Sequence, residues 1–587
     1  MTSSQVGGWQ GFSRRNVVNF LILVLLLWCV FAGYRLTRAV SAASDARGAL
    51  DSVDLDYRAW MAGDDQFDAD IASVRSSLEK VHSSLSGPLM APVRIVPFVG
   101  RQVRSADALS ESGSQMIGVV DDLLVVIDEA GPGLQAADKR VATLRLLAAQ
   151  MAEAHATLGS LDLGPEENLL SQLREVRTDL SDAIEEGLHT MEVGSEVAGE
   201  VAALLDGPSR YVLGAANNAE MRAGSGLVLS AGEIVAGSGG VLVTEMTPSW
   251  TRNLGSPVAI PDADLRSRWG WLTDGQNWLL NWMSPRFPAT AEHAVAMWNA
   301  QSDQLAEGIV VVDPFALRTI LRLTGPVETS IGTVDAQNVI ELFLNGQYQG
   351  SLPGTGDQVL RRDSLADVAP NVVQKLFTAD IDVARLFDQL RDVVDGRHLL
   401  IWSADTDRQQ VWERVGVSGA LDDRTIAVSL INRGPNKLDY FTNLRTEIAA
   451  VREGDRFATV TLTTTITNRT PVGQPQYVEG PVQGSITPAG AYRGIVTFNV
   501  PGAAINVSID DVDDLSVAGP DGPTRVVGTE VLIERGSSAV VIVRFDLPNR
   551  VTELTLEPSA RFPIETWVIG GESRRDGLSE TVLVSEL

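Results

Sequence analysis

The spacing of apolar residues changes along this chain, and that change constrains the fold more than any other feature. Through residues 46–205 apolar side chains recur at intervals of three and four, the spacing that packed helices require. The clearest run is Ile71, Val74, Leu78, Val81 and Leu85. From about Asp439 onward the interval is two, which is typical of strands. The sequence therefore predicts a helical region followed by a β-rich region.

Prolines and glycines divide the helical region. Interior prolines break helices because they lose a hydrogen bond and clash with the preceding turn, and the breaks fall at Pro88, Pro92 and Pro97, at 131–133 and at 159–165. We expect three or four antiparallel helices over 39–206, packed as a coiled-coil-like bundle or stalk. A structural bundle and a partner-binding coiled coil are both compatible with this pattern.

Residues 207–430 are expected to form an α/β domain. The apolar run 310–312 precedes Asp313-Pro314 and an amphipathic stretch, the order of a strand followed by a proline-opened helix. Helices are predicted over 335–343 and 364–394, and a buried strand over 398–402. Residues 431–587 alternate with period two, so we predict a C-terminal β-sandwich with one solvated face per sheet. The fold class is α+β multidomain.

An 18-residue apolar run, Val17–Tyr34, precedes all of this. It approaches the length that crosses a bilayer core, so a transmembrane helix is predicted over 16–38. Residues 1–15 would be a cytoplasmic tail, and the large C-terminal region would be extracytoplasmic. Two alternatives are a cleaved signal peptide, because Arg14 and Arg15 precede the run, and a buried core helix.

Charge and cysteine content exclude several function classes. The formal net charge of the 587 residues is −28. Such a chain repels phosphate backbones, so nucleic acid is not an expected partner. Cys29 is the one cysteine, which excludes an intramolecular disulfide and a Cys-based zinc site. The sequence has no HExxH, Walker A, G-x-S-x-G or Rossmann glycine motif, and we assign no catalytic residue, metal ligand or cofactor.

The segment 217–226 is the best candidate for a ligand site. It concentrates amides, a carboxylate, a guanidinium and glycines, which can approach a ligand closely. The candidate ligand-binding residues are Asn217, Asn218, Glu220, Arg222, Gly224 and Gly226, together with the distant Arg286. Arg222 could hold a phosphate or carboxylate with its planar fork. The alternative is a tight loop in which Glu220 pairs with Arg222, and Asp313 is expected to cap a helix.

Two further clusters each have two interpretations. Five tryptophans lie within a short stretch, either as a glycan-stacking surface or as core packing: Trp250, Trp269, Trp271, Trp278 and Trp282. Four aspartates, which lack EF-hand spacing, form either a calcium site or a solvated loop: Asp510, Asp511, Asp513 and Asp514.

Four ordered motifs resemble one family. They lie at 210–226, 284–291, 308–327 and 436–440, and together they resemble the actinobacterial membrane-protein family known as domain of unknown function 4012, over roughly residues 80–500. This resemblance implies an envelope location and a single N-terminal anchor, but no known reaction. The segment 308–327 is also similar to LytR-CpsA-Psr phosphotransferases, which move glycopolymers from polyprenyl-pyrophosphate carriers. Arg222 falls where those enzymes have Arg-x-Asp, but Gly224 replaces the aspartate, and their Pro-Arg-Asp motif has no counterpart.

These observations predict a single-pass, cell-envelope scaffold or glycopolymer-binding protein. Its expected partners are the lipid bilayer, through the N-terminal helix, and a cell-wall glycan or polyprenyl-phosphate ligand. The alternative is a degenerate LytR-CpsA-Psr-like phosphotransferase that acts on a polyprenyl-linked substrate.

Overall fold

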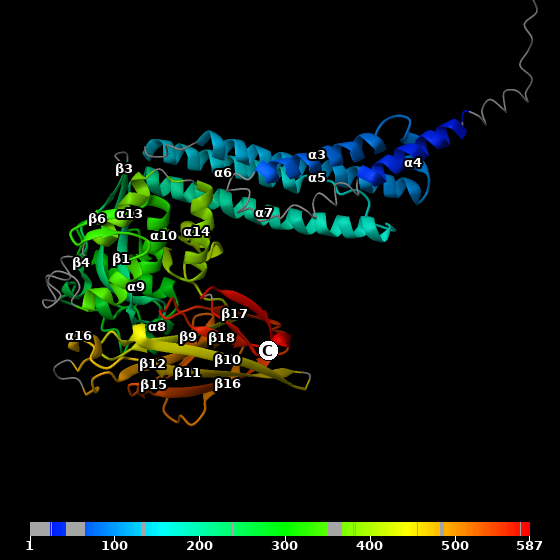
Figure 1. Ribbon diagram of the computed structural model, residues 1–587. Coiled ribbons are helices and arrows are strands. Elements are labelled where there is room, and N and C mark those ends of the chain that lie inside the picture. Colours follow the sequence, from blue (N-terminus) through cyan, green and yellow to red (C-terminus); the bar gives the residue numbers. More distant parts are fainter. Residues whose placement is uncertain are drawn as a thin grey trace, which may run out of the picture. The chain divides into compact units, whose positions relative to one another are not determined.

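The computed structural model describes residues 24, 26–42, 65–130, 137–237, 240–349, 367–379, 381, 383–454, 456–481, 486–575 and 577–587. The chain forms two compact units (Figure 1). The first comprises Met1–Glu129 and Leu146–Ser195, and the second comprises Ala130–Arg145 and Glu196–Leu587.

The predicted transmembrane helix over 16–38 requires correction. Among the described residues, no helix combines the length and the apolar character needed to cross a membrane. The described helix over 26–42 instead packs on protein, because Ala32, Ala39 and Ala42 are buried in one cluster with Val81 and Leu85. Arg35 in the same helix donates from Nε to the carbonyl oxygen of Ser84 at 2.9 Å. Residues 16–23 and 25, and the predicted tail over 1–15, lie outside the described residues.

Helices occupy the range in which the bundle was expected. They are α3 (Asp65–Leu85), α4 (Ala91–Ile95), α5 (Val99–Ala130), α6 (Ala137–Gly159) and α7 (Ser171–Asp206). The predicted seam of α3 is partly buried, with Val74, Val81 and Leu85 each less than 5% exposed. Pro92 stands in the first turn of α4, where a missing N–H costs little.

The second unit begins with a mixed sheet of order β3-β2-β1-β5-β8, with β4 paired to β2. Its strands are β1 (Ser209–Met221), β2 (Gly226–Gly237), β3 (Gly240–Val243), β4 (Thr247–Pro248), β5 (Gly308–Val312) and β8 (Leu399–Ser403). Strands β1 and β5 are parallel, whereas β2 and β8 run antiparallel to their neighbours. A small hairpin, β6 (Val327–Thr329) and β7 (Gly332–Val334), stands apart from this sheet.

Helices cover both faces of this sheet. One face packs on α9 (Phe287–Asn299) and η2 (Trp278–Leu280), and the other packs on α10 (Pro314–Thr324) and α13 (Val368–Thr378). The remaining helical elements here are η1 (Ser249–Thr251), α8 (Ala263–Trp269), α11 (Val339–Leu344), η3 (Gly346–Tyr348), α14 (Val383–Asp395) and α15 (Thr406–Arg414). The helix predicted over 335–343 starts later than expected, because the Asp335 carboxylate accepts from the backbone N–H groups of Gln337 and Asn338 and forms a turn.

Two six-stranded sheets complete the unit (Figure 1, yellow to red). The first has the order β13-β16-β11-β10-β18-β19 and the second β14-β15-β12-β9-β17-β20. The strands are β9 (Thr425–Asn432), β10 (Thr442–Glu453), β11 (Phe457–Asn468), β12 (Tyr492–Pro501), β13 (Ile505–Ile509), β14 (Val517–Asp521), β15 (Thr524–Ile533), β16 (Ser538–Pro548), β17 (Glu553–Glu557), β18 (Thr566–Ile569), β19 (Glu572–Arg574) and β20 (Glu580–Leu583). Short helices η4 (Leu438–Phe441), α16 (Gln476–Glu479) and η5 (Val584–Glu586) connect or end them.

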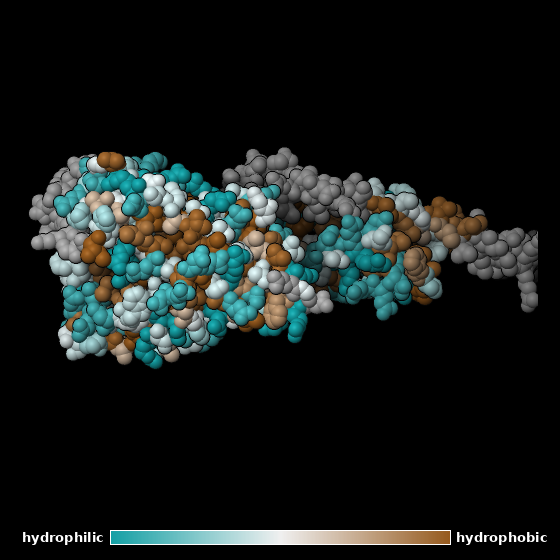
Figure 2. Space-filling model, turned by 90° about the horizontal axis from the view of Figure 1, so that it is seen from below, coloured by the Kyte–Doolittle hydropathy of each residue, from teal (hydrophilic) through white to brown (hydrophobic). Residues whose placement is uncertain are grey.

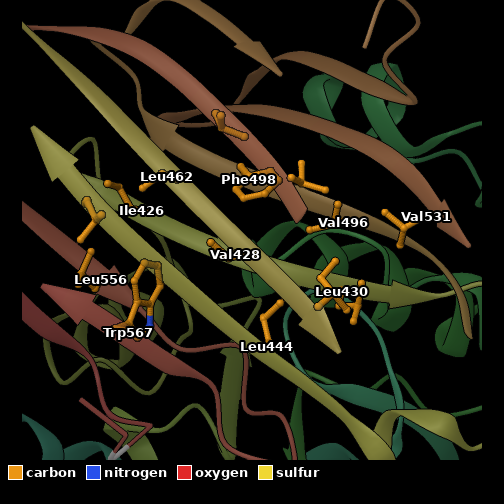
Figure 3. Close-up of a cluster of buried hydrophobic side chains, with 14 of the residues drawn as sticks. Ile426, Val428, Leu430, Leu444, Leu462, Val496, Phe498, Val531, Leu556 and Trp567 are labelled. Carbon is orange, nitrogen blue, oxygen red and sulfur yellow. The ribbon is translucent and has the colours of Figure 1, made fainter. Parts of the chain in front are cut away.

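The core of this sandwich lies between the two sheets. Figure 3 shows Val428 from β9 and Phe498 from β12 in one cluster with Leu444 from β10 and Leu462 from β11. Alternation on β11 is confirmed, because Val460, Leu462, Thr464 and Ile466 are buried while the threonines between them are half-buried. Figure 2 looks onto the sandwich side of this unit, where hydrophobic residues are interspersed with hydrophilic ones.

The second sheet departs from the expected one solvated face. Strand β9 is buried at every position, and β12 at nearly every position. The reason is a separate cluster in which Ile431 and Ile495 pack against Ala223, Leu265 and Trp269 of the α/β part. The outer face of this sheet is therefore covered by the α/β part, and the two parts form one continuous structure.

Candidate functional site

The carboxyl end of β1 extends beyond the sheet. The register ends with Ala215 opposite Val312, so Asn217–Met221 continue past the end of β5. In open α/β sheets, ligands bind outside the carboxyl ends of the strands. Here that edge gathers Asn218 from β1, Asp313 after β5 and His398 before β8.

Asp313 organises this edge. One carboxylate oxygen accepts from the backbone N–H groups of Phe315 and Ala316 at 2.9 and 3.1 Å, which confirms the predicted helix cap. The other accepts from Asn218 Nδ2 at 2.9 Å and lies 2.6 Å from His398 Nδ1. A proton on Nδ1 would leave Nε2 of His398 free to accept one. The pair therefore has the geometry of an oriented base.

The sequence alone did not single out His398, because no other histidine lies near it in the chain. The available signal was positional, since His398 directly precedes one buried strand and Asp313 directly follows another. The ring of Phe315 stacks on His398 with centroids 4.4 Å apart, and the His398 side chain is 14% exposed.

Arg222 is buried and Glu220 is half-buried, and both are paired within the protein. Arg222 Nη1 donates to the carbonyl oxygens of Met221 and Asn432 at 2.9 and 3.2 Å, and Nη2 lies 3.6 Å from Glu220. Lys437 forms an ion pair with the same Glu220. Burial lowers the pKa of Arg222 to about 10, although Asp439 and Tyr492 oppose that shift. Both charges of the loop thus have internal partners.

Asp439 joins the end of β1 to the sandwich. Its carboxylate accepts from Met221 N at 3.0 Å, Asn432 Nδ2 at 2.7 Å and the Tyr492 hydroxyl at 2.9 Å. Burial raises the pKa of this carboxyl, against the charge of Arg561 and the three hydrogen bonds. Asp439 lies in the sequence motif 436–440, but the sequence alone predicted no role for its carboxylate.

Arg561 and Glu565 lie in the sandwich loop that reaches this junction. Arg561 is 3% exposed, its Nη2 lies 3.9 Å from Asp439, and its three guanidinium nitrogens have no hydrogen-bond partner among the described residues. Glu565 accepts from Ser559 N at 3.0 Å. Burial raises the pKa of Glu565 to about 7, although Arg561 and several hydrogen bonds oppose the shift. From the same loop, the carbonyl oxygen of Ala560 accepts from Asn218 Nδ2 at 2.5 Å.

The remaining loop candidates hold the loop to the rest of the chain. Asn217 Oδ1 accepts from Ala219 N at 2.8 Å, and its Nδ2 donates to the Tyr348 hydroxyl at 3.0 Å. A Cβ on Gly226 would lie 2.3 Å from the Asn217 carbonyl carbon, and one on Gly224 would lie 3.3 Å from backbone atoms of Pro285. Both glycines also line a cavity of about 20 Å³ beside Trp282, roughly the space of one water molecule. The two glycines therefore allow segments of the backbone to approach each other closely.

Arg286 makes a separate junction. Its Nε lies 2.7 Å from Asp521 Oδ1, and its Nη2 lies 2.8 Å from Asp262 Oδ1. Burial alone would lower the pKa of Arg286, but the two carboxylates raise it above its ordinary value. Asp262 also caps α8 by accepting from Leu265 N at 2.6 Å. Arg286 shares none of these partners with Arg222, so the structure does not bring the two arginines to one site.

The other sequence clusters divide between interior and surface. Trp269, Trp278 and Trp282 are buried, whereas Trp250 is 48% and Trp271 is 54% exposed. In the aspartate cluster, Asp510 pairs with Arg544 at 3.0 Å. Across the part of the chain that the structure describes, no group of three or more His, Cys, Asp or Glu side chains is arranged to hold a metal ion.

Comparison with known proteins finds a family model that matches one part of the chain. Residues 206–348 match the family described as protein of unknown function (DUF4012). The match spans β1 to η3 and includes Asn217–Gly226 and Asp313. No curated protein and no solved structure matches the chain.

Proposed function

We propose that this chain is a non-enzymatic binding and scaffolding protein of the cell envelope, with glycopolymers as its ligands. The observation that supports it is the internal pairing at the carboxyl edge of the sheet. Glu220, Arg222, Lys437 and Asp439 hold β1 against the sandwich. Because these charged groups pair with one another, the edge connects two parts of the protein. We therefore expect ligands to bind at the outer surface instead.

An experiment with two readouts tests this function. The full chain is purified from a bacterial host and analysed for co-purified polyprenyl phosphate by mass spectrometry, and its sedimentation with a panel of purified cell-wall polysaccharides is measured. We expect binding to at least one polysaccharide and no retained polyprenyl phosphate. Failure to bind any polysaccharide would overturn the glycopolymer part of the proposal.

A second candidate function is glycopolymer phosphotransfer from a polyprenyl-linked substrate. The Asp313–His398 pair favours it, because a histidine oriented by a carboxylate can accept a proton from an attacking hydroxyl. Stoichiometric polyprenyl phosphate, together with transfer activity that His398→Ala abolishes, would favour this function over the first.

The proposal includes an extracytoplasmic location, which the family resemblance supports. Ser585 is exposed near the end of the chain, so Ser585→Cys can be labelled with a membrane-impermeant thiol reagent in intact cells. The native Cys29 is also exposed and is replaced in a Cys29→Ser background. Labelling before lysis is expected, and labelling only after lysis would contradict this location.

A further inference from the structure

Trp271 presents a flat aromatic surface that is held in place. The residue is 54% exposed, and its Nε1 donates to the carbonyl oxygen of Arg268 at 3.0 Å. This bond fixes the indole, so little conformational entropy is lost when a ligand stacks on it. Flat aromatic faces with a polar handle suit ligands that combine apolar and polar surface.

The segment that carries Trp271 is fastened to the sandwich. Arg286 bridges Asp262, the cap of α8, to Asp521 at the end of β14. Asp264 Oδ2 accepts from Gly522 N at 3.0 Å, and Arg268 Nη1 donates to the carbonyl oxygen of Ala518 at 2.5 Å. Trp271 therefore rests on a rigid support.

Arg433 lies with its guanidinium over the indole and pairs with no carboxylate among the described residues. Its Cζ lies 5.7 Å from the centroid of the Trp271 ring. Within the described part of the chain its guanidinium makes no hydrogen bond or ion pair, since Glu530, the nearby carboxylate, pairs with Arg493 at 3.1 Å. Burial lowers the pKa of Arg433; Glu530 opposes that shift, while Arg493 and Arg222 add to it. The surroundings of Arg433 are thus locally cationic, in a chain of formal charge −28.

We propose that Trp271 and Arg433 form a binding site for an anionic glycan, in which a sugar ring stacks on the indole and its carboxylate or phosphate pairs with the guanidinium. This proposal rests on the proposed glycopolymer function and assigns it a site. A glycan fits better than an acidic peptide, because the site pairs one broad ring face with one cation. Arg433 can bind the anion through two parallel N–H groups.

The test uses the full chain and oligogalacturonate, a carboxylated glycan, with a neutral maltooligosaccharide and polyglutamate as comparison ligands. Titration calorimetry should show binding of oligogalacturonate alone. Trp271→Ala and Arg433→Gln should each raise the Kd about tenfold or more, the loss expected for a charge-assisted contact or a stacked ring. Trp250→Ala, which removes another exposed tryptophan, should leave the Kd unchanged, and circular dichroism checks the fold of each variant.

The remaining outcomes separate this site from the general function. Oligogalacturonate binding that survives both substitutions would overturn the site but leave the glycopolymer function standing. Absence of oligogalacturonate binding, with binding to neutral polysaccharides only, would overturn the anionic specificity and therefore this site. Binding of polyglutamate with equal affinity would identify an acidic-peptide site instead. If no polysaccharide binds at all, both proposals are wrong.

Discussion

The junction around Asp439 and the surface around Trp271 use the same residue types in opposite ways. In the junction, Asp439 and Arg222 are buried and Glu220 is half-buried, and each has partners within the chain. At the surface, Arg433 is half-buried over an exposed indole and forms no ion pair with a carboxylate in the described part of the chain. Burying an unpaired charge destabilises the folded state, whereas a cation in contact with water can remain unpaired until a ligand binds. The comparison separates charges that stabilise the fold from those available to bind.

The largest effect is expected at the centre of the junction. Asp439→Ala removes the acceptor for three hydrogen bonds and leaves the buried Arg222 and Arg561 with less compensating charge. The free energy of unfolding should fall by about 3–5 kcal/mol, measured by urea denaturation. Asp510→Ala removes an exposed pair with Arg544 and should cost about 0–1 kcal/mol. Equal costs for the two variants would contradict the role assigned to the junction.

A smaller effect should depend on pH. Burial raises the pKa of Glu565 to about 7, above the value of about 4.3 in an unfolded chain. The folded state therefore binds more protons between these values, and this group's contribution to stability falls as pH rises from about 4.5 to 7. The free energy of unfolding of Glu565→Gln, compared with that of wild type, should therefore rise between pH 5 and pH 8, by about 3 kcal/mol at most.

Urea denaturation at the two pH values measures this difference, and Glu572→Gln is the control because Glu572 is exposed. A gain of the same size in the control would show that the pH effect does not come from burial. If the free energy of unfolding changes between pH 5 and pH 8 by the same amount in Glu565→Gln as in wild type, the Glu565 carboxyl is already charged at pH 5.

Backbone contact in the loop should give a still smaller effect. A Cβ on Gly226 would meet the backbone of Asn217 and Asn218, and Gly226→Ala should cost about 1–3 kcal/mol, as overpacking does. Gly199 lies in α7 with open space around it, so Gly199→Ala should instead stabilise by about 0.5–1 kcal/mol. Thermal melts followed by circular dichroism give both values. A Gly226→Ala variant as stable as wild type would show that the loop accommodates the added methyl group without loss of stability.

Much of the fold could be predicted, because local patterns determined it. The alternation on β11 and the cap by Asp313 both depend on residues close in sequence. The buried second sheet could not be predicted, because strand β12 is covered by a segment about 230 residues earlier in the chain. The transmembrane prediction considered apolar length alone, and the packing of Ala32, Ala39 and Ala42 on other helices is not visible in the run itself.

The candidate site shows the same limit. Clustering of amides, charges and glycines in 217–226 identified a segment rich in contacts, but the partners of Arg222 and Asn218 come from positions 313, 432 and 560. The local sequence could not show whether these groups bind a ligand or pair with distant residues of the chain. The exposed Trp271 was in the tryptophan cluster, yet its exposure depends on how α8 packs on β14.

The central claim is that buried charges stabilise this protein and that Trp271 and Arg433 bind its ligand. It is tested most directly by measuring both the free energy of unfolding and the Kd for oligogalacturonate in Arg222→Ala and Trp271→Ala. The account predicts that Arg222→Ala lowers the free energy of unfolding while its folded fraction keeps the wild-type Kd. Trp271→Ala should weaken binding about tenfold and leave stability within about 0.5 kcal/mol. If Arg222→Ala does not fold, Arg222→Lys replaces it. An Arg222 variant with wild-type stability and lost binding would contradict the account and return the ligand site to the sheet edge.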